Sequence, residues 1–153
     1  MKIYSAQKND FMISTDQSKL NITVVHDYLH NESYWAKNIP IQTLQRGIDN
    51  SFCFRVYKKL QQVGFARLVT DYATYAHLCD VFILPEFRGN GLSKWLIEFI
   101  LANPEVQGLR KWSLGTKDAH GLYAQFGFKP YEDVSRLMQK NNPGIYENPA
   151  EGI

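Results

Sequence analysis

A short turn that contains two glycines connects a strand-like apolar run to an amphipathic helix. The apolar run covers residues 81–84, the turn covers residues 88–91, and the helix begins at Leu92. Gly89 and Gly91 lack the Cβ atoms that would keep a ligand away from the backbone. The first turn of the following helix has N–H groups without intrahelical acceptors, at the positive end of the helix dipole. This arrangement predicts an anion site of the kind that takes a phosphate or pyrophosphate.

The helix after the turn is defined by its apolar spacing. Large apolar side chains recur at intervals of three and four residues, which places them on one face: Leu92, Trp95, Leu96, Phe99 and Ile100. The turn lacks the Gly-x-Gly-x-x-Gly pattern of dinucleotide-binding folds and the Gly-Lys-Ser/Thr of a Walker loop. Two glycines here are also compatible with a plain tight connection, so the local pattern alone leaves both interpretations open.

The residues around the turn resemble a known family signature. Residues 80–93 are similar to the motif of the GNAT superfamily of acyl-CoA-dependent N-acetyltransferases, which reads Arg/Gln-x-x-Gly-x-Gly/Ala. Arg88 and Gly91 match, and Ser93 stands in place of the final Gly or Ala. Residues 116–128 resemble the second motif of the family, a strand end followed by a helix with Leu-Tyr and then Gly-Phe. The two motifs occur in the expected order.

The resemblance implies an α/β (α+β) fold, with a mixed, mostly antiparallel central sheet of about six to seven strands, splayed at its centre and flanked by about four helices. We expect residues 1–153 to form a single N-acetyltransferase domain with an irregular tail from about 141 to 153, which includes Asn148 and Pro149. The apolar patterns predict strands at 11–15, 52–57, 63–69, 75–84 and 111–115, and helices at 22–29, 41–50, 92–103 and 118–126. Two closing strands are expected from Phe128 onward and at 135–139.

In that fold, acetyl-CoA enters between the strand that contains residues 81–83 and the strand that contains Trp112. The resemblance therefore implies cofactor-binding positions in the first strand, in the glycine turn and in the second motif. These positions are Val81, Phe82, Ile83, Arg88, Gly89, Asn90, Gly91, Leu92, Ser93, Thr116, Asp118 and Tyr123. No metal site is expected.

Acyl transfer to an amine requires a base for the amine and benefits from a proton donor for the departing thiolate. The resemblance assigns the donor to Tyr123, although its helical spacing is also typical of an aromatic core residue. Asp80 is the candidate base because burial in a strand raises a carboxyl pKa, and a purely structural role or a water relay is the alternative. His77 is a second candidate, on the opposite face of a regular strand from Asp80. Cys79 as a covalent acyl carrier is the weakest alternative.

The acceptor end of the cleft is expected to be framed by Tyr28, Tyr34, Trp35 and His77, although ordinary packing explains aromatic residues equally well. We expect an N-acetyltransferase that moves an acetyl group from acetyl-CoA to a primary amine of a small molecule, by direct attack in a ternary complex. A protein or peptide amine is the alternative acceptor. A catalytically silent acyl-CoA-binding sensor module is the alternative from a different class.

Composition narrows the class of protein. With 44% hydrophobic residues, 21% charged residues and a formal charge of +2, the chain has a globular composition and lacks the Lys/Arg clusters of a nucleic-acid binder. No apolar run approaches the roughly 18 residues of a membrane span, and the N-terminus lacks the apolar core of a secretory signal. We therefore expect a cytoplasmic protein without membrane or nucleic-acid partners. Cys53 and Cys79 are expected to be buried free thiols, and a homodimer is compatible with the sequence.

Overall fold

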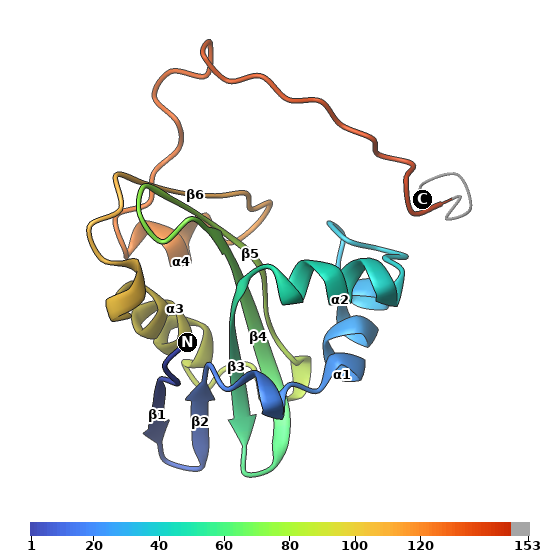
Figure 1. Cartoon of the computed structure of the whole chain (residues 1–153), viewed down its shortest axis with the longest axis vertical. Coiled ribbons are helices and arrows are strands. Elements are labelled where there is room, and N and C mark those ends of the chain that lie inside the picture. Colours follow the sequence, from blue (N-terminus) through green and yellow to red (C-terminus); the bar gives the residue numbers. More distant parts are fainter. Residues whose placement is uncertain (148–153) are drawn as a thin grey trace.

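The structure, a computed structural model, describes residues 1–147. Its centre is a six-stranded sheet in the order β1-β2-β3-β4-β5-β6 (Figure 1). The strands are β1 (Ser5–Lys8), β2 (Phe11–Ser14), β3 (Phe52–Lys58), β4 (Gln61–Thr70), β5 (Tyr75–Ile83) and β6 (Lys111–Leu114). All neighbouring strands are antiparallel except β5 and β6, which are parallel. The predicted mixed, mostly antiparallel sheet is therefore confirmed.

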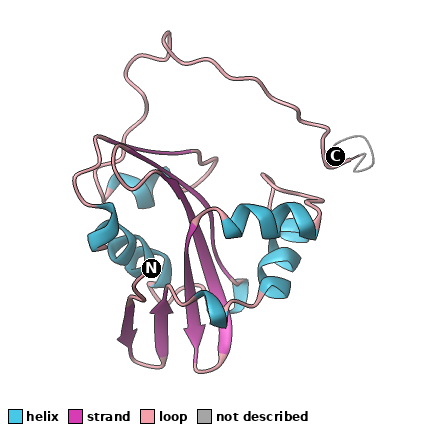
Figure 2. Ribbon diagram, in the orientation of Figure 1, coloured by secondary structure: helices cyan, strands magenta, loops and turns pink. Residues whose placement is uncertain are grey.

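Residues 1–147 form four α-helices, of which three lie in connections between strands and the fourth follows β6 (Figure 2). They are α1 (Ile22–Asp27), α2 (Ile41–Asp49), α3 (Leu92–Leu101) and α4 (His120–Ala124). A π-helical turn, Tyr28–Glu32, continues α1, and short 3-10 turns occur at Gln17–Lys19, Pro85–Phe87 and Pro104–Val106. No helix within residues 1–147 is long and apolar enough to cross a membrane.

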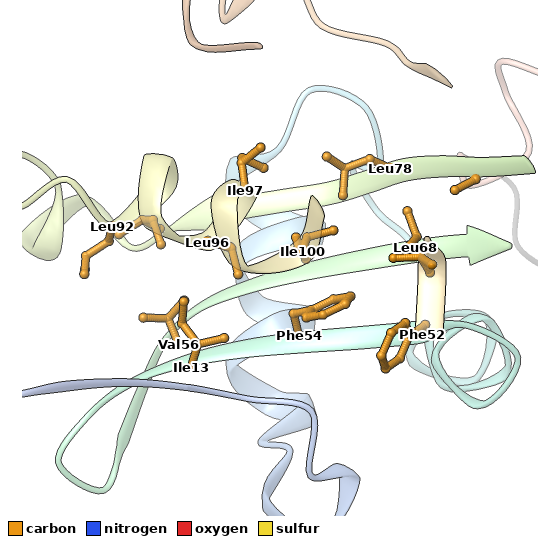
Figure 3. Packing of buried hydrophobic residues seen from close by; sticks show 14 of the residues in the cluster. Ile13, Phe52, Phe54, Val56, Leu68, Leu78, Leu92, Leu96, Ile97 and Ile100 are labelled. Carbon is orange, nitrogen blue, oxygen red and sulfur yellow. The ribbon is translucent and has the colours of Figure 1, made fainter. Parts of the chain in front are cut away.

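The helices cover both faces of the sheet, so the core has two layers. On one face, α3 packs Leu96, Ile97 and Ile100 against Phe54 and Leu68 of the central strands (Figure 3). On the other face, α1 and α2 cover a second core cluster, which includes Val25, Leu29, Leu44, Ile48, Phe65 and Phe82. Both layers bury large apolar side chains, which is the main favourable term for such a fold.

Strands β5 and β6 diverge, and this divergence creates space for a ligand. Their pairing covers only Tyr75 to Leu78 of β5, against Lys111 to Leu114 of β6. The rest of β5, up to Ile83, pairs with β4 alone. A register shift opposite the segment from Phe65 to Arg67 marks a bulge in β5. The bulge contains Asp80, whose φ of 54° lies in the left-handed region.

Strand β1 is one difference from the prediction. Ser5–Lys8 forms an edge strand antiparallel to β2, through a tight turn in which Asn9 has a φ of 55°. The strand is short and mostly exposed, and three of its four residues are polar or charged. Sequence patterns of alternating apolar residues therefore miss it, since it is held by main-chain pairing at the sheet edge.

The two predicted closing strands are wrong. Neither the stretch that begins at Phe128 nor residues 135–139 forms a strand. The chain instead leaves the body after Phe128 and forms a long exposed arch (Figure 1). Pro130 has no N–H to donate to a strand ladder, and within residues 1–147 the residues that follow it pair with no strand, including the edge strand β6. The predicted irregular tail is confirmed for residues 141–147, whereas Asn148 and Pro149 lie outside the described residues.

Candidate functional site

The glycine turn before α3 presents an open backbone. Gly89 and Gly91 have φ values of 83° and 70°, and a Cβ atom at either position would meet no heavy atom within 4 Å. Gly91 is the N-cap of α3, and no side chain caps that helix. Asn90 stabilises the turn, because its Nδ2 donates to the carbonyl of Phe87 at 2.9 Å. The first N–H groups of α3 are therefore free to bind an anion, as the sequence predicts.

A cavity of about 420 Å³ extends from this turn along β5 to α4, and we call it the groove. Its walls include Val81, Phe82 and Ile83 of β5, together with Arg88, Ser93 and Tyr123. Tyr28, Tyr34, Trp35 and Asp118 also line it.

Arg88 forms hydrogen bonds to two residues that line the groove. Its Nε donates to the carbonyl of Ile83 at 3.1 Å, and its Nη2 donates to the hydroxyl of Tyr28 at 3.0 Å. The Tyr28 ring stacks on Phe82 at 4.0 Å between centroids. The guanidinium thus holds the glycine turn against β5 and the segment after α1, while keeping its positive charge at the groove.

A second cavity of about 500 Å³, which we call the cleft, lies where β5 and β6 diverge. His77, Cys79 and Asp80 of β5 face residues 115–119, which follow β6. Tyr34 and Trp35 border the cleft as well as the groove. Thr116 lines the cleft but not the groove.

Tyr123 of α4 lies between the two cavities and lines both. Its side chain is buried, with 8% of the residue surface exposed. Burial chiefly, and then the nearby Tyr34 and Asp118, raises the pKa of its hydroxyl to about 12. Within residues 1–147, no hydrogen bond of the structure uses this hydroxyl. It is therefore a protonated and uncommitted donor at neutral pH.

Asp80 is held by two hydrogen bonds. Arg67 Nε donates to its Oδ2 at 2.7 Å, and Trp35 Nε1 donates to its Oδ1 at 2.9 Å. Arg67 also donates from Nη1 to the hydroxyl of Ser51 at 3.0 Å. Both carboxylate oxygens are thus engaged, and the indole of Trp35 is fixed at the border of the cleft.

His77 contacts Ser113 across the paired part of β5 and β6. Its Nδ1 lies 2.7 Å from the Ser113 hydroxyl, which also contacts the hydroxyl of Tyr75. Burial chiefly, and then the positive charge of Arg67, lowers the pKa of the His77 imidazole below its ordinary value of 6.5. The ring is therefore neutral at physiological pH. A tautomer that donates from Nδ1 to Ser113 leaves Nε2 as an acceptor.

The predicted opposition of His77 and Asp80 is wrong. Regular alternation along a strand places positions three apart on opposite faces. The bulge at Asp80, with its positive φ, breaks that alternation, so both side chains line the cleft.

The loop after the π-helical turn is joined to the segment after β6. The N–H of Lys117 donates to the Tyr34 hydroxyl at 2.9 Å, and Lys117 Nζ lies 5.5 Å from the centroid of the Tyr34 ring. The rings of Tyr34 and Trp35 meet edge to face at 5.0 Å between centroids. These contacts close the cleft on one side.

Cys53 and Cys79 are free, as predicted, with Cys53 buried and Cys79 partly so. Burial chiefly raises the pKa of both thiols to about 12. Both are therefore protonated at neutral pH, which weighs against Cys79 as a nucleophile.

The structure brings most of the predicted site residues together around Tyr123. Gly89, Asn90 and Gly91 form the turn itself and line neither cavity. Leu92 is different, because its side chain is buried in the core and only its N–H can serve a ligand. Sequence reasoning missed Arg67 and Lys117, whose roles depend on contacts to Asp80 and Tyr34. Lys117 lies inside the second motif, whereas nothing in the sequence singles out Arg67.

Comparison with known proteins relates the chain to acetyltransferases. The family described as Acetyltransferase (GNAT) domain matches residues 49–130. A protein of Gibberella zeae named as a putative acetyltransferase is 30% identical, over 85% of this chain and 85% of its own length.

Solved structures share the fold. A putative acetyltransferase of the GNAT family from Xanthomonas campestris pv. campestris has a TM-score of 0.86 and 49% identity, over 89% of this chain and 96% of that one. A GNAT family acetyltransferase from Elizabethkingia anophelis, whose crystal structure has acetyl-CoA bound, has a TM-score of 0.61 and 14% identity. That match covers 82% of this chain and 80% of the other.

Proposed function

Because the chain belongs to the GNAT family of acetyltransferases, we propose that it transfers an acetyl group from acetyl-CoA to a primary amine of a small molecule, by direct attack in a ternary complex. The observation that carries this proposal is the position of Tyr123. Its buried side chain forms part of the wall of both the groove and the cleft, and its hydroxyl is protonated. A proton donor at this junction suits a reaction between ligands that arrive from two cavities.

The residues of the groove fit coenzyme A. The glycine turn offers uncapped N–H groups at the positive end of α3, and Arg88 adds a cation beside it. Beyond Leu78, the β6 side of β5 has unpaired main chain that can pair with the amide groups of the pantetheine arm. When bound, acetyl-CoA supplies an activated acetyl thioester with a thiolate leaving group.

We assign the proton transfers to residues of the cleft. Tyr123 donates its hydroxyl proton toward the leaving sulfur, which is the role that a protonated phenol of raised pKa can fill. His77 is neutral and lines the cleft, so it accepts the proton of the amine directly or through a water.

Asp80, the base expected from the sequence, is assigned a positioning role instead. Its two hydrogen bonds, to Arg67 and Trp35, occupy both oxygens and stabilise the carboxylate in place. Asp80 therefore fixes the Trp35 indole at the border of the cleft, and its charge acts on His77.

The cleft suits a small amine. Its volume of about 500 Å³ lies within the range of small-molecule sites. Its walls combine the rings of Tyr34 and Trp35 with the carboxylate of Asp118, and aromatic faces and a carboxylate both attract an ammonium group. The bridge between Tyr34 and Lys117 limits the space available to a large acceptor.

A thiol-release assay tests the proposal. The full chain is incubated with acetyl-CoA and a panel of small primary amines, lysine peptides and N-terminal amines, and CoA binding is measured in parallel by calorimetry. We expect turnover on at least one small amine, and a much lower rate on peptides. Tight CoA binding without turnover on any amine would instead identify an acyl-CoA-binding module, and turnover only on peptides would overturn the acceptor class.

A further inference from the structure

Three polar side chains form a hydrogen-bonded chain that leads from the cleft to the surface of the molecule. Nδ1 of His77 lies 2.7 Å from Oγ of Ser113, and that same oxygen contacts the hydroxyl of Tyr75. His77 lines the cleft. Ser113 is buried, with 7% of its surface exposed, whereas Tyr75 is 37% exposed. The chain therefore begins at the proton acceptor assigned above and ends at a hydroxyl that solvent can reach.

The pairing of β5 with β6 brings these three side chains together. Ala76 and Leu78 of β5 are buried in the core cluster that includes α3. Because side chains alternate along a strand, Tyr75 and His77 lie together on the opposite face. The parallel register places Ser113 of β6 beside His77, where its hydroxyl contacts both side chains. The hydrogen-bonded chain is thus a direct product of the strand pairing.

The hydrogen-bonding capacity of each group allows a proton to move along this chain. Burial, and then the charge of Arg67, lower the pKa of the His77 imidazole, whereas the charge of Asp80 raises it. The net lowering leaves the ring neutral at physiological pH. With Nδ1 donating to Ser113, Nε2 is the acceptor for a proton from the cleft. A hydroxyl both donates and accepts, so Ser113 and Tyr75 can each take up one proton and release another.

We propose that Ser113 and Tyr75 form a relay that carries the proton of the amine away from His77. The relay rests on the proposed function, because the amine is the source of the proton. The amine gives a proton to Nε2 of His77, and Nδ1 gives its own proton to Oγ of Ser113. The Ser113 hydroxyl proton passes to the Tyr75 oxygen, and the Tyr75 proton passes to water. Each group ends with the number of protons that it had, and the His77 ring is again neutral, protonated at Nε2.

The relay removes a charge from a site that does not favour it. An imidazolium at His77 is half-buried and acted on by the cation of Arg67, so its charge is costly while it lasts. When both substrates are bound, they occupy the groove and the cleft, and the bridge between Tyr34 and Lys117 closes one side. The strand pairing then offers a route to solvent that does not cross the cleft. After the product leaves, Nε2 gives its proton to water and Nδ1 regains one along the same chain, which restores the starting tautomer.

Kinetics of two variants of the full chain test the relay. Ser113→Ala removes its middle hydroxyl, and Tyr75→Phe removes its last hydroxyl and keeps the ring. We expect each variant to lose roughly tenfold in kcat, with the KM values for acetyl-CoA and the amine almost unchanged, because only proton removal is slowed. Imidazole added to the buffer at constant pH should restore most of the lost rate, since a small diffusing base can take the proton instead. The same addition should leave the parent rate unchanged.

Tyr72→Phe is the matched control. Tyr72 precedes β5, is 36% exposed, and its hydroxyl contacts the sulfur of Met1, so the variant should keep the parent kcat. Parent-like kcat in Ser113→Ala and Tyr75→Phe, or a loss that imidazole does not relieve, would overturn the relay and leave the acetyltransferase activity in place. A parent chain that releases no thiol with any amine would instead contradict the proposed function, and the relay with it.

Nitrogen NMR of the His77 ring supplies a readout that does not depend on turnover. In the parent at neutral pH, Nδ1 should carry the proton, because it donates to Ser113. Tyr75→Phe should keep this tautomer, whereas Ser113→Ala should lose the preference for it. Circular dichroism verifies that Ser113→Ala folds, and Tyr75→Phe, at a partly exposed site, tests the relay without touching the buried serine. A parent ring that carries its proton on Nε2 would overturn the relay.

Discussion

Arg67 and Asp80 form an ion pair across β4 and β5, with 2.7 Å between Nε and Oδ2. The pair depends on the bulge in β5, because the positive φ of Asp80 turns its carboxylate toward Arg67 and Trp35. The same bulge leaves His77 and Asp80 lining one cavity. Both oxygens of Asp80 accept hydrogen bonds, from Arg67 and from Trp35. On this geometry rest the positioning role that we propose for Asp80 and the proton-accepting role that we propose for His77.

The pH profiles of two variants distinguish those roles. In the parent enzyme, kcat/KM should fall as the pH drops through the lowered pKa of His77, because protonation removes the acceptor. His77→Gln should lose roughly 10²-fold in kcat and should lose this acidic limb. An unchanged acidic limb in His77→Gln would assign the amine proton to water or to another group.

Asp80→Asn should keep the acidic limb. The negative charge of Asp80 raises the pKa of His77, so its removal should move the limb to lower pH. The variant should also lose about 2 kcal/mol of unfolding free energy, because Arg67 is left with a weaker partner in a largely buried site. Denaturant unfolding measures the loss. Disappearance of the acidic limb in Asp80→Asn would restore Asp80 as the base.

Gly91→Val tests the glycine turn. Because a Cβ atom at Gly91 meets nothing within 4 Å, the substitution acts through the positive φ and through the bulk that it adds at the N-terminus of α3. We expect CoA affinity to fall at least tenfold, about 1.4 kcal/mol, in calorimetric titration. Gly108→Val is the matched control, since Gly108 has a φ of 74° and equally open surroundings but lies outside the turn before α3. Equal CoA affinity in the two variants would remove the turn from the binding site.

Tyr34→Phe tests the contact across the cleft. It removes the acceptor of the Lys117 N–H and keeps the ring. Loss of one hydrogen bond, about 1 kcal/mol, should raise the KM for the amine roughly fivefold and speed the exchange of the Lys117 amide. CoA affinity should change little. Unaltered kinetics with faster amide exchange would mean that the bridge is structural and does not shape the acceptor site.

Much of the fold could be predicted because its elements are patterned. The apolar side chains of α3 and of β3 to β5 recur at helical and strand spacing, and this spacing predicts that they are buried. The glycine turn between β5 and α3 predicts an anion site. Strand β1 is polar and exists through main-chain pairing, so it carries no such pattern. The predicted closing strands have β-prone residues, but a strand also needs a neighbouring strand to pair with. Within residues 1–147, these residues do not pair with the free edge of β6.

The site was harder to predict where it depends on local geometry. Successive side chains of a strand point to opposite faces of the sheet, and this alternation holds for Ala76, His77 and Leu78. It fails at the Asp80 bulge. Partners that lie far apart in sequence, such as Arg67 and Asp80 or Tyr34 and Lys117, meet only after the chain has folded. The motif residues identify the region of the site, whereas these contacts decide which group is free to react.

Tyr123→Phe tests the central claim most directly, because it keeps the ring in place and deletes only the hydroxyl. We expect kcat to fall by roughly 10²-fold while CoA affinity and thermal stability stay almost unchanged, since a proton donor acts in the transition state. Tyr72→Phe is the control, because within residues 1–147 its hydroxyl has one hydrogen-bond partner, the sulfur of Met1 at 3.9 Å, and Tyr72 lines neither the groove nor the cleft. A loss of less than about threefold in Tyr123→Phe, well below the usual range for acid catalysis, would show that Tyr123 is a packing residue and would contradict the account.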